Sequence, residues 1–345
     1  MSVIGSNVLA GSAGAGGGAY SGDIAVAHSL SPYVAAYSWD SGFGTKHSNP
    51  STLPPNACFG IAFSPDGNYL AVATEDSPYI VVYAWSSSGF GSKFSNPSTT
   101  PTNLAFHVAW TADSSNIAVG HVSSPYITAY PWSSSGFGTK YSNPSSALTD
   151  HVRGCDFHPD QNALAVANDS SPFVIVYNWS GSGFGSKFSN PSTLPTNQGL
   201  GVTFSPDGYN LAVAHTSSPY ISVYPWSSGF GTKYSNPSSL PTAHCYSAAW
   251  SPDGNDIALS HQESPYIAAY PWSSGFGSKY SNPSTTPTGT GNMVAFSPDG
   301  NDIAVGHYNS PFITAYPWDS GFGTKYANPS TLPASTCHAV SFSPS

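Results

Sequence analysis

The chain has 345 residues, of which only 7% are charged, and its formal net charge is -9. The seven lysines all occupy one position of a repeat, and Arg153 is the only other cation in the sequence. No basic stripe exists that could neutralise phosphates, which argues against nucleic-acid binding and against an anionic membrane surface. Abundant Gly, Pro and aromatic residues favour short strands and turns over helices.

Residues 1–21 form a Gly-rich and Ala-rich start, MSVIGSNVLAGSAGAGGGAYS. It lacks the positive region and the sustained apolar region of a secretory signal, and no run of the chain approaches about 18 apolar residues. We expect residues 1–21 to be a docking arm that is anchored by Ile4, Val8 and Leu9. Residues 22–345 are expected to form one domain.

A Ser-Pro-Tyr/Phe motif recurs every 46 or 47 residues, from Ser31 to Ser310. Each interval holds four short segments separated by Pro, Asp, Gly, Ser and Asn, which are the residues of tight turns. Seven units of this length predict an all-β, seven-bladed propeller with four-stranded blades. A helical solenoid would need apolar residues at i, i+3 and i+4, and Pro and Gly interrupt such spacing throughout the chain.

The four expected strands of a unit resemble VAFSPDG, DIAVGH, YITAYPW and GFGTKYSN, in that order. The second carries small Ala residues suited to the narrow centre of a blade. The third and fourth carry rings suited to the wide rim, and Tyr126, Tyr130 and Trp132 are expected on one face of their strand. The chain enters the repeat in a second strand at Gly22 and ends in a first strand, HAVSFSPS. We therefore expect the C-terminal strand to complete a blade with three N-terminal strands, which removes the exposed sheet edge.

The run FSPDGNDIAVGH followed by SPFITAYPW, from Phe296 to Trp318, resembles the WD-repeat signature. The resemblance covers about residues 22 to 345, although the Trp-Asp dipeptide of that family is kept only at Trp39 and Trp318. It implies a WD-like propeller.

Three repeated polar positions have structural and functional interpretations. His ends the second strand in five units, but equivalent positions lie around a circle and cannot converge on one metal ion, so a hydrogen bond at the strand end is favoured. Asp in the SPDG turn and Lys in the fourth strand are explained by turn bonding and by edge protection, rather than by catalysis, Ca²⁺ or anion binding. With no nucleophile motif, nucleotide loop or metal triad, the sequence predicts no metal, no cofactor and no enzymatic activity. A catalytic site would also break the symmetry, and the repeats hardly do.

One region does differ between copies, namely the connection from each outer strand to the next inner strand. All seven connections are expected to meet on one face, where they could bind a partner. Drift in unconstrained loops would explain the same variation. The candidate binding residues in this region are His107, Asp150, His151, Arg153, His244, Tyr246 and His338.

The stretch IGSNVLAGSAGAGGGAY is similar to the openings of tail and accessory structural proteins of tailed bacteriophages. This resemblance implies a non-enzymatic virion structural protein, either a capsid decoration or a tail-fibre component, on the surface of an extracellular particle. Its arm would bind other virion proteins, and its propeller would be displayed toward a host-surface glycan or protein. The alternatives are a lectin-like carbohydrate-binding propeller and an intracellular WD-like scaffold.

Overall fold

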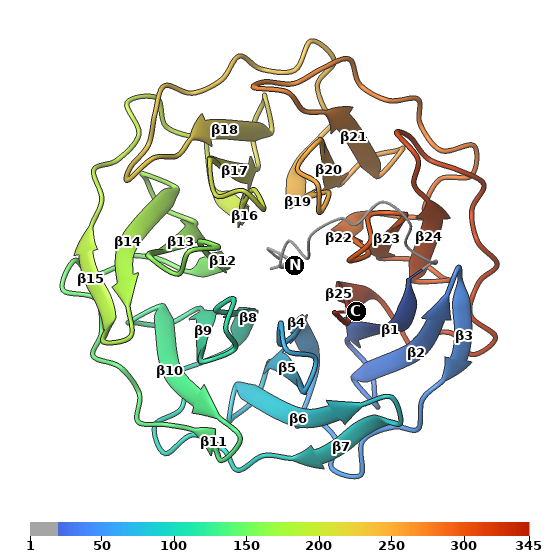
Figure 1. The fold of residues 1–345 in the computed structure, drawn as a ribbon, viewed down its shortest axis with the longest axis horizontal. Helices are drawn as coiled ribbons and strands as arrows, with labels where there is room; N and C mark the ends of the chain where they lie inside the picture. The colour runs from blue at the N-terminus through green and yellow to red at the C-terminus, as the bar shows by residue number, and fades with distance from the viewer. Residues whose placement is uncertain (1–19, 345) are drawn as a thin grey trace.

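The computed structural model describes residues 20–344, and over this range the regular structure consists of β-strands (Figure 1). The strands form seven sheets arranged as blades around one axis, which confirms the predicted seven-bladed propeller. Within residues 20–344, no helix has the length and apolar character needed to cross a membrane.

Each blade has an inner, a second and a third strand, and four blades have a regular outer strand. The inner strands are β4 (Cys58–Phe63), β8 (Ala105–Trp110), β12 (Val152–Phe157), β16 (Gly199–Phe204), β19 (Cys245–Trp250), β22 (Gly291–Phe296) and β25 (Cys337–Phe342). The second strands are β1 (Ser21–His28), β5 (Tyr69–Thr74), β9 (Asn116–His121), β13 (Ala163–Asn168), β17 (Asn210–His215), β20 (Asp256–His261) and β23 (Asp302–His307). The third strands are β2 (Val34–Asp40), β6 (Ile80–Ser86), β10 (Ile127–Ser133), β14 (Val174–Ser180), β18 (Ile221–Pro225), β21 (Ile267–Pro271) and β24 (Ile313–Pro317). The outer strands are β3 (Phe43–Lys46), β7 (Gly89–Lys93), β11 (Gly136–Phe137) and β15 (Gly183–Lys187).

The ring closes as the repeat phase predicts. Strand β25 pairs antiparallel with β1, with Val340 opposite Val26, and completes the sheet β25-β1-β2-β3. The Tyr20 hydroxyl donates to the Ser343 carbonyl at 2.6 Å, so the two ends of the described chain are also joined by a buried hydrogen bond. The C-terminal strand therefore covers the edge of β1 and gives this blade the same inner strand as the other six.

The outer strands are shorter than predicted. They are shortest in the blades that have a proline near the end of the third strand. Blades with Ser38, Ala84 or Asn178 at that position have outer strands of four or five residues. Proline has no N–H to donate to the ladder. With Pro131 the outer strand shrinks to two residues, and in the three blades with Pro225, Pro271 and Pro317 it is a single bridge.

The repeated Ser-Pro-Tyr/Phe motif forms the turn that precedes each third strand, so the third strand starts one residue later than predicted. Each Ser-Pro peptide bond is cis, and the following Tyr or Phe has a φ between 67° and 70°. Strand β10 accordingly begins at Ile127, and Tyr126 lies in the turn rather than on a strand face with Tyr130 and Trp132.

At three junctions, neighbouring blades are joined by a polar contact at the start of the second strand, where a Trp indole donates to Asp23, Asp256 or Asp302. At the closing junction, the Trp39 indole donates to Asp302 Oδ2 at 2.9 Å and the Tyr326 hydroxyl donates to Asp302 Oδ1 at 2.7 Å. The two positions vary together along the chain. Where the acceptor is Asp or Asn, the ring partner is polar, as in the pairs Asp23–His47, Asn116–Tyr141, Asn210–Tyr234, Asp256–Tyr280 and Asp302–Tyr326. Where that position holds Tyr69 or Ala163, the ring position holds Phe94 or Phe188.

Replacing Asp302 by Ala is expected to lower the free energy of unfolding by about 3 kcal/mol, because it leaves the buried Trp39 indole and the half-buried Tyr326 hydroxyl without their acceptor. The double variant Asp302→Ala with Tyr326→Phe is expected to lose less, since it reproduces the Ala163 and Phe188 combination of another blade. Urea unfolding followed by tryptophan fluorescence measures both losses. A double variant less stable than Asp302→Ala would contradict this account.

The three repeated polar positions have structural roles. His121 is fully buried, and its ring contacts the Thr128 hydroxyl on β10 at 2.9 Å, with equivalent contacts at His215 and His307. Asp66 accepts the Ser64 hydroxyl at 2.6 Å within its SPDG turn. Lys46 donates to Asn49 at 2.5 Å on the outer rim. These contacts confirm the hydrogen-bonding interpretation of the repeated Asp at Asp66 and of the repeated His at His121, His215 and His307.

Candidate functional site

Each inner strand carries a β-bulge near its first residue, and the extra residue is the one that differs between blades. On β4, for example, Cys58 pairs with Thr74 and Gly60 pairs with Ala73, so Phe59 is left out of the ladder. A bulge re-aims its side chain and is common beside active sites. We call these seven residues the bulge ring, and the face of the propeller where the inner strands begin the entry face. The bulge ring consists of Phe59, Phe106, Arg153, Leu200, Tyr246, Asn292 and His338.

About half of the bulge ring is a continuous stack of side chains. The His338 ring lies 4.7 Å from that of Phe59, and the rings of Phe59 and Phe106 are 5.8 Å apart. The Arg153 guanidinium lies 4.3 Å from the centre of the Phe106 ring, which is cation–π geometry. The contacts show that bulge residues of consecutive blades meet, and they hold Arg153 at one end of the stack.

Arg153 is also fixed by a carboxylate that follows β13. Its Nε lies 3.0 Å from Asp169 Oδ1, and its Nη2 lies 2.7 Å from Asp169 Oδ2, so the pair is bidentate. The Asp169 side chain is only 7% exposed, and His151 Nδ1 lies 3.4 Å from its Oδ2. Asp150 accepts the Ser170 hydroxyl, which holds the pKa of Asp150 below its usual value. Four charged or titratable side chains therefore form one network beside the bulge ring.

This network could in principle hold a metal, because Asp150, His151 and Asp169 offer ligand atoms within 4.8 Å of one another. However, both carboxylate oxygens of Asp169 already bind Arg153. A cation placed there would lie against the guanidinium and compete for the same oxygens. The described residues thus fit an ion-pair network better than a metal centre.

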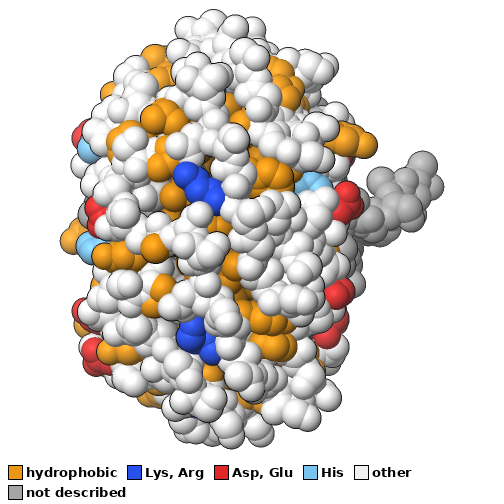
Figure 2. Space-filling view, turned by 90° about the vertical axis from the view of Figure 1, so that its left-hand side faces the viewer, with side chains coloured by type: hydrophobic (Ala, Val, Ile, Leu, Met, Phe, Trp, Pro, Cys, Tyr) orange, Lys and Arg blue, Asp and Glu red, His pale blue; other side chains and the backbone are white. Residues whose placement is uncertain are grey.

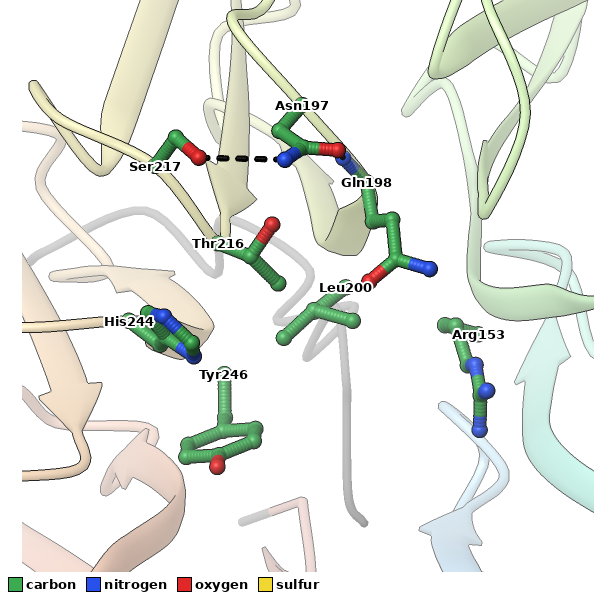
Figure 3. A pocket seen from close by; sticks show the side chains of 8 residues that line it. All are labelled: Arg153, Asn197, Gln198, Leu200, Thr216, Ser217, His244 and Tyr246. Carbon is green, nitrogen blue, oxygen red and sulfur yellow. Dashed lines mark hydrogen bonds between the residues drawn. The ribbon is translucent and has the colours of Figure 1, made fainter.

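A pocket of about 310 Å³ opens beside Arg153, a volume in the range of small-molecule sites (Figure 3). Figure 3 shows Arg153 on one side, His244 and Tyr246 on the other, and Leu200 between them. The Asn197 amide donates to the Ser217 hydroxyl at 3.1 Å, so part of the polar wall is held in place. The lining comes from three consecutive blades and consists of Arg153, Asn197, Gln198, Leu200, Thr216, Ser217, His244 and Tyr246.

Two further pocket residues, Tyr246 and His244, carry side chains that can form hydrogen bonds with a ligand. Burial raises the pKa of Tyr246, so its phenol stays protonated and can donate a hydrogen bond. His244 is exposed on the entry face, and its ring centre lies 6.5 Å from that of Tyr220. Together with Arg153, the pocket offers a cation, a neutral donor and an imidazole.

The structure separates the predicted binding residues into three groups. Arg153, His244 and Tyr246 line the pocket, and Asp150 and His151 lie in the network next to it. His338 lies in the stacked half of the bulge ring, where it contacts the Ser29 hydroxyl at 2.7 Å. His107 is fully buried, and its Nδ1 accepts the Cys155 N–H at 3.2 Å, so it does not reach the entry face. The predicted anchors Ile4, Val8 and Leu9 lie outside the described residues.

Five of the residues that line the pocket were not among the predicted binding residues. They are Asn197, Gln198, Leu200, Thr216 and Ser217. Thr216 and Ser217 come from the turn after the second strand, where no binding residue was predicted. A signal was present, because the first residue of this turn changes in every blade. It is Ser29, Glu75, Val122, Asp169, Thr216, Gln262 or Tyr308.

The described chain is thus a seven-bladed propeller with an asymmetric polar pocket at its entry face. No protein-family model matches it, and no curated protein sequence matches it. Many solved structures share its fold. One, from Bacteroides uniformis and named as a 6-phosphogluconolactonase, has 14% sequence identity and a TM-score of 0.71 over 93% of this chain and 99% of its own.

A periplasmic gluconolactonase from Pseudomonas aeruginosa has 15% identity and a TM-score of 0.69 over 94% of this chain and 99% of its own. Hydrazine synthase from Kuenenia stuttgartiensis has 15% identity and a TM-score of 0.61 over 81% of this chain and 80% of its own. At these identities the likeness establishes the fold alone.

These neighbours correct the predicted function. The expectation of a non-enzymatic phage virion protein is wrong, because two of the structural neighbours above bear the names of lactonases and nothing among the neighbours points to virion proteins or WD repeats. The N-terminal resemblance on which that expectation depended covers residues 4–20, of which only Tyr20 lies within the described residues. The predicted partners, the predicted location on a particle and the boundary at residue 22 are untested and stay predictions.

Proposed function

We propose that this protein hydrolyses a sugar lactone in the pocket at its entry face. The observation that carries the proposal is the convergence of Arg153, His244 and Tyr246 on one polar pocket. The names of two structural neighbours support the same reaction class.

The pocket suits a small polyhydroxylated ring. Asn197, Gln198, Thr216 and Ser217 present amide and hydroxyl groups, which are the groups that exchange hydrogen bonds with sugar hydroxyls. Leu200 supplies an apolar surface between the two sides. A few oriented polar groups around an apolar patch are typical of small-molecule sites.

Lactone opening requires a base, a water molecule and stabilisation of the oxyanion. In the proposed mechanism, His244 takes a proton from water as the water oxygen bonds to the lactone carbonyl carbon. Tyr246 and Arg153 stabilise the negative charge on the carbonyl oxygen. The carbonyl then re-forms, the ring C–O bond breaks, and the ring oxygen receives the proton from His244. One water and one lactone give one open hydroxy acid, so atoms and charge balance.

Replacing Tyr246 by Phe is expected to lower kcat/KM for δ-gluconolactone by about 10²-fold, the effect of losing one oxyanion donor. The assay follows acid release against the spontaneous rate, because sugar lactones open slowly in water. Tyr308→Phe is the matched control, since Tyr308 is 60% exposed in the turn after β23 and does not line the pocket. Equal rates for Tyr246→Phe and the unaltered protein would contradict the role of Tyr246. A protein without activity above the spontaneous rate would overturn the proposed function.

A further inference from the structure

We infer that the substrate is an uncharged sugar lactone, and that Asp169 is a specificity-determining residue that excludes a phosphorylated one. This inference rests on the proposed function. It concerns a property of the site that the fold does not determine, since it follows from the placement of charges specific to this chain.

The entry face is acidic among the described residues. The turns and connections around the bulge ring carry Glu75, Asp76, Asp150, Asp169 and Glu263, against the single guanidinium of Arg153. These segments lie on the same face, because the Glu75 N–H donates to the Ala57 carbonyl and the Gln262 N–H donates to the His244 carbonyl. The net field at the pocket therefore opposes the approach of an anion.

The lysines do not offset this charge. They lie on the outer strands or just after them, and six of them donate to an Asn side chain three residues further on. Figure 2 shows basic side chains halfway across the outer rim, whereas acidic side chains lie toward the two faces. A phosphate in the pocket would therefore have Arg153 as its nearest described cation.

Arg153 is committed to an internal partner. Two of its nitrogens contact the largely buried Asp169, and the face of the guanidinium packs on Phe106. A phosphate dianion beside Arg153 would also lie beside the carboxylates of Asp169 and Asp150, and like charges at this range repel strongly in a partly desolvated site. A neutral lactone carbonyl gains from the guanidinium without bringing another anion next to Asp169.

Asp169 occupies a turn position that differs in every blade, and among the six equivalent residues only Glu75 is also acidic. The equivalent position holds Ser29, Val122 or Thr216 in other blades, so a carboxylate is not required by the turn itself. Its bidentate contact orients Arg153 and offsets part of its positive charge, so that Arg153 still donates to a neutral carbonyl but attracts an anion less. We therefore assign two roles to Asp169: it holds the Arg153 side chain in place, and it disfavours the binding of anionic substrates.

The test compares kcat/KM for δ-gluconolactone and for its 6-phosphate, each corrected for spontaneous opening, in the full-length protein. We expect the neutral lactone to be preferred by at least about tenfold at low salt, and the preference to shrink as added salt screens the field. Asp169→Asn keeps the shape and removes the charge, and is expected to shift the ratio toward the phosphorylated lactone by about tenfold. The matched control is Asp76→Asn, since Asp76 accepts the Asn56 amide on the same face but does not line the pocket. It is expected to change the ratio less than twofold, as a rim charge would.

The outcomes separate the two proposals. If neither lactone is hydrolysed, the proposed function is wrong and this inference falls with it. If the phosphorylated lactone is preferred, the lactonase function stands and the inference is overturned. If the neutral lactone is preferred but Asp169→Asn leaves the ratio unchanged, the role assigned to Asp169 is overturned.

Discussion

Lowering the pH from 7 to 4.5 is expected to unfold the propeller cooperatively. In the folded protein, burial lowers the pKa of seven histidines to about 3 or about 4, from an ordinary value of 6.5. These histidines stay neutral in the fold, whereas the unfolded chain protonates them near pH 6.5. Their contribution is thus fully present above pH 6.5 and is lost as the pH falls toward 4. The seven are His28, His107, His121, His215, His261, His307 and His338.

The size of this effect follows from proton linkage. Each proton taken up on unfolding costs the fold about 1.4 kcal/mol per pH unit. Seven such protons would give a slope of roughly 10 kcal/mol per pH unit well below pH 6.5, which exceeds the whole stability of many domains. Circular dichroism across a pH series, combined with urea titrations, measures the slope.

The chain supplies its own matched variants for this test. Asn168 occupies the position that His261 has in another blade, so His261→Asn introduces a residue that this fold already accepts. We expect His261→Asn to remove about one proton from the slope and Asn168→His to add about one. A stability that is constant between pH 7 and pH 4.5 would show that these histidines are not buried in solution.

Asp156 is expected to limit stability at the alkaline end. It is 1% exposed on β12, and its Oδ2 accepts the Phe204 N–H of the neighbouring blade at 2.8 Å. Its Oδ1 has no hydrogen-bond partner, and burial raises the pKa of Asp156 to about 7. The fold therefore favours the protonated acid. The stability that Asp156 contributes is present below pH 4 and is lost as the pH rises through 7.

Replacing Asp156 by Asn is expected to stabilise the protein at pH 8 by up to about 4 kcal/mol, the linkage equivalent of a shift of some three pH units. An Asn carbonyl can still accept the Phe204 N–H, so the contact between blades is kept. The gain is expected to vanish near pH 4, where the native acid and the amide are both neutral. Stability curves for the variant and the unaltered protein that run parallel from pH 4 to pH 8 would contradict this account.

The fold could be predicted from the sequence because the repeat length and the strand in which the repeat begins determine it. The spacing of the Ser-Pro-Tyr/Phe motif sets the number of blades, and a chain that begins in a second strand must close with its last strand. The outer strands could have been predicted better, since Pro131 and its equivalents remove the donor that a full ladder needs. The start of the third strand could not, because the turn at Tyr126 depends on backbone angles that the residue types do not determine.

The site was predictable only in part, because a bulge depends on pairing between strands. Variation in the connections correctly marked Arg153, His244 and Tyr246 as residues of one face. It could not show that His107, the residue directly after the bulge, pairs with Gly120 and is turned into the blade interface. A shift of one residue along a strand moves the side chain to the opposite face of the sheet. Such a shift is visible only in the pairing between strands.

The near-identity of the blades was a poor guide to the site. Near-identical blades led to the expectation that the chain has no catalytic site, because such a site must be asymmetric. In the structure, the residues that line the pocket come from the bulge ring, from the connections and from the turns after the second strands, all of which are positions that differ between blades.

The bulge ring also lets side chains on the entry face change without affecting how the strands pair. Because each bulge residue stands outside the ladder of its strand, a change of side chain there alters the entry face without altering strand register. Seven positions can then vary without a change of strand register, on a frame that duplication alone can produce. A propeller of this kind could acquire a new ligand by exchanging a handful of side chains, and a library randomised at these seven codons would explore that range directly.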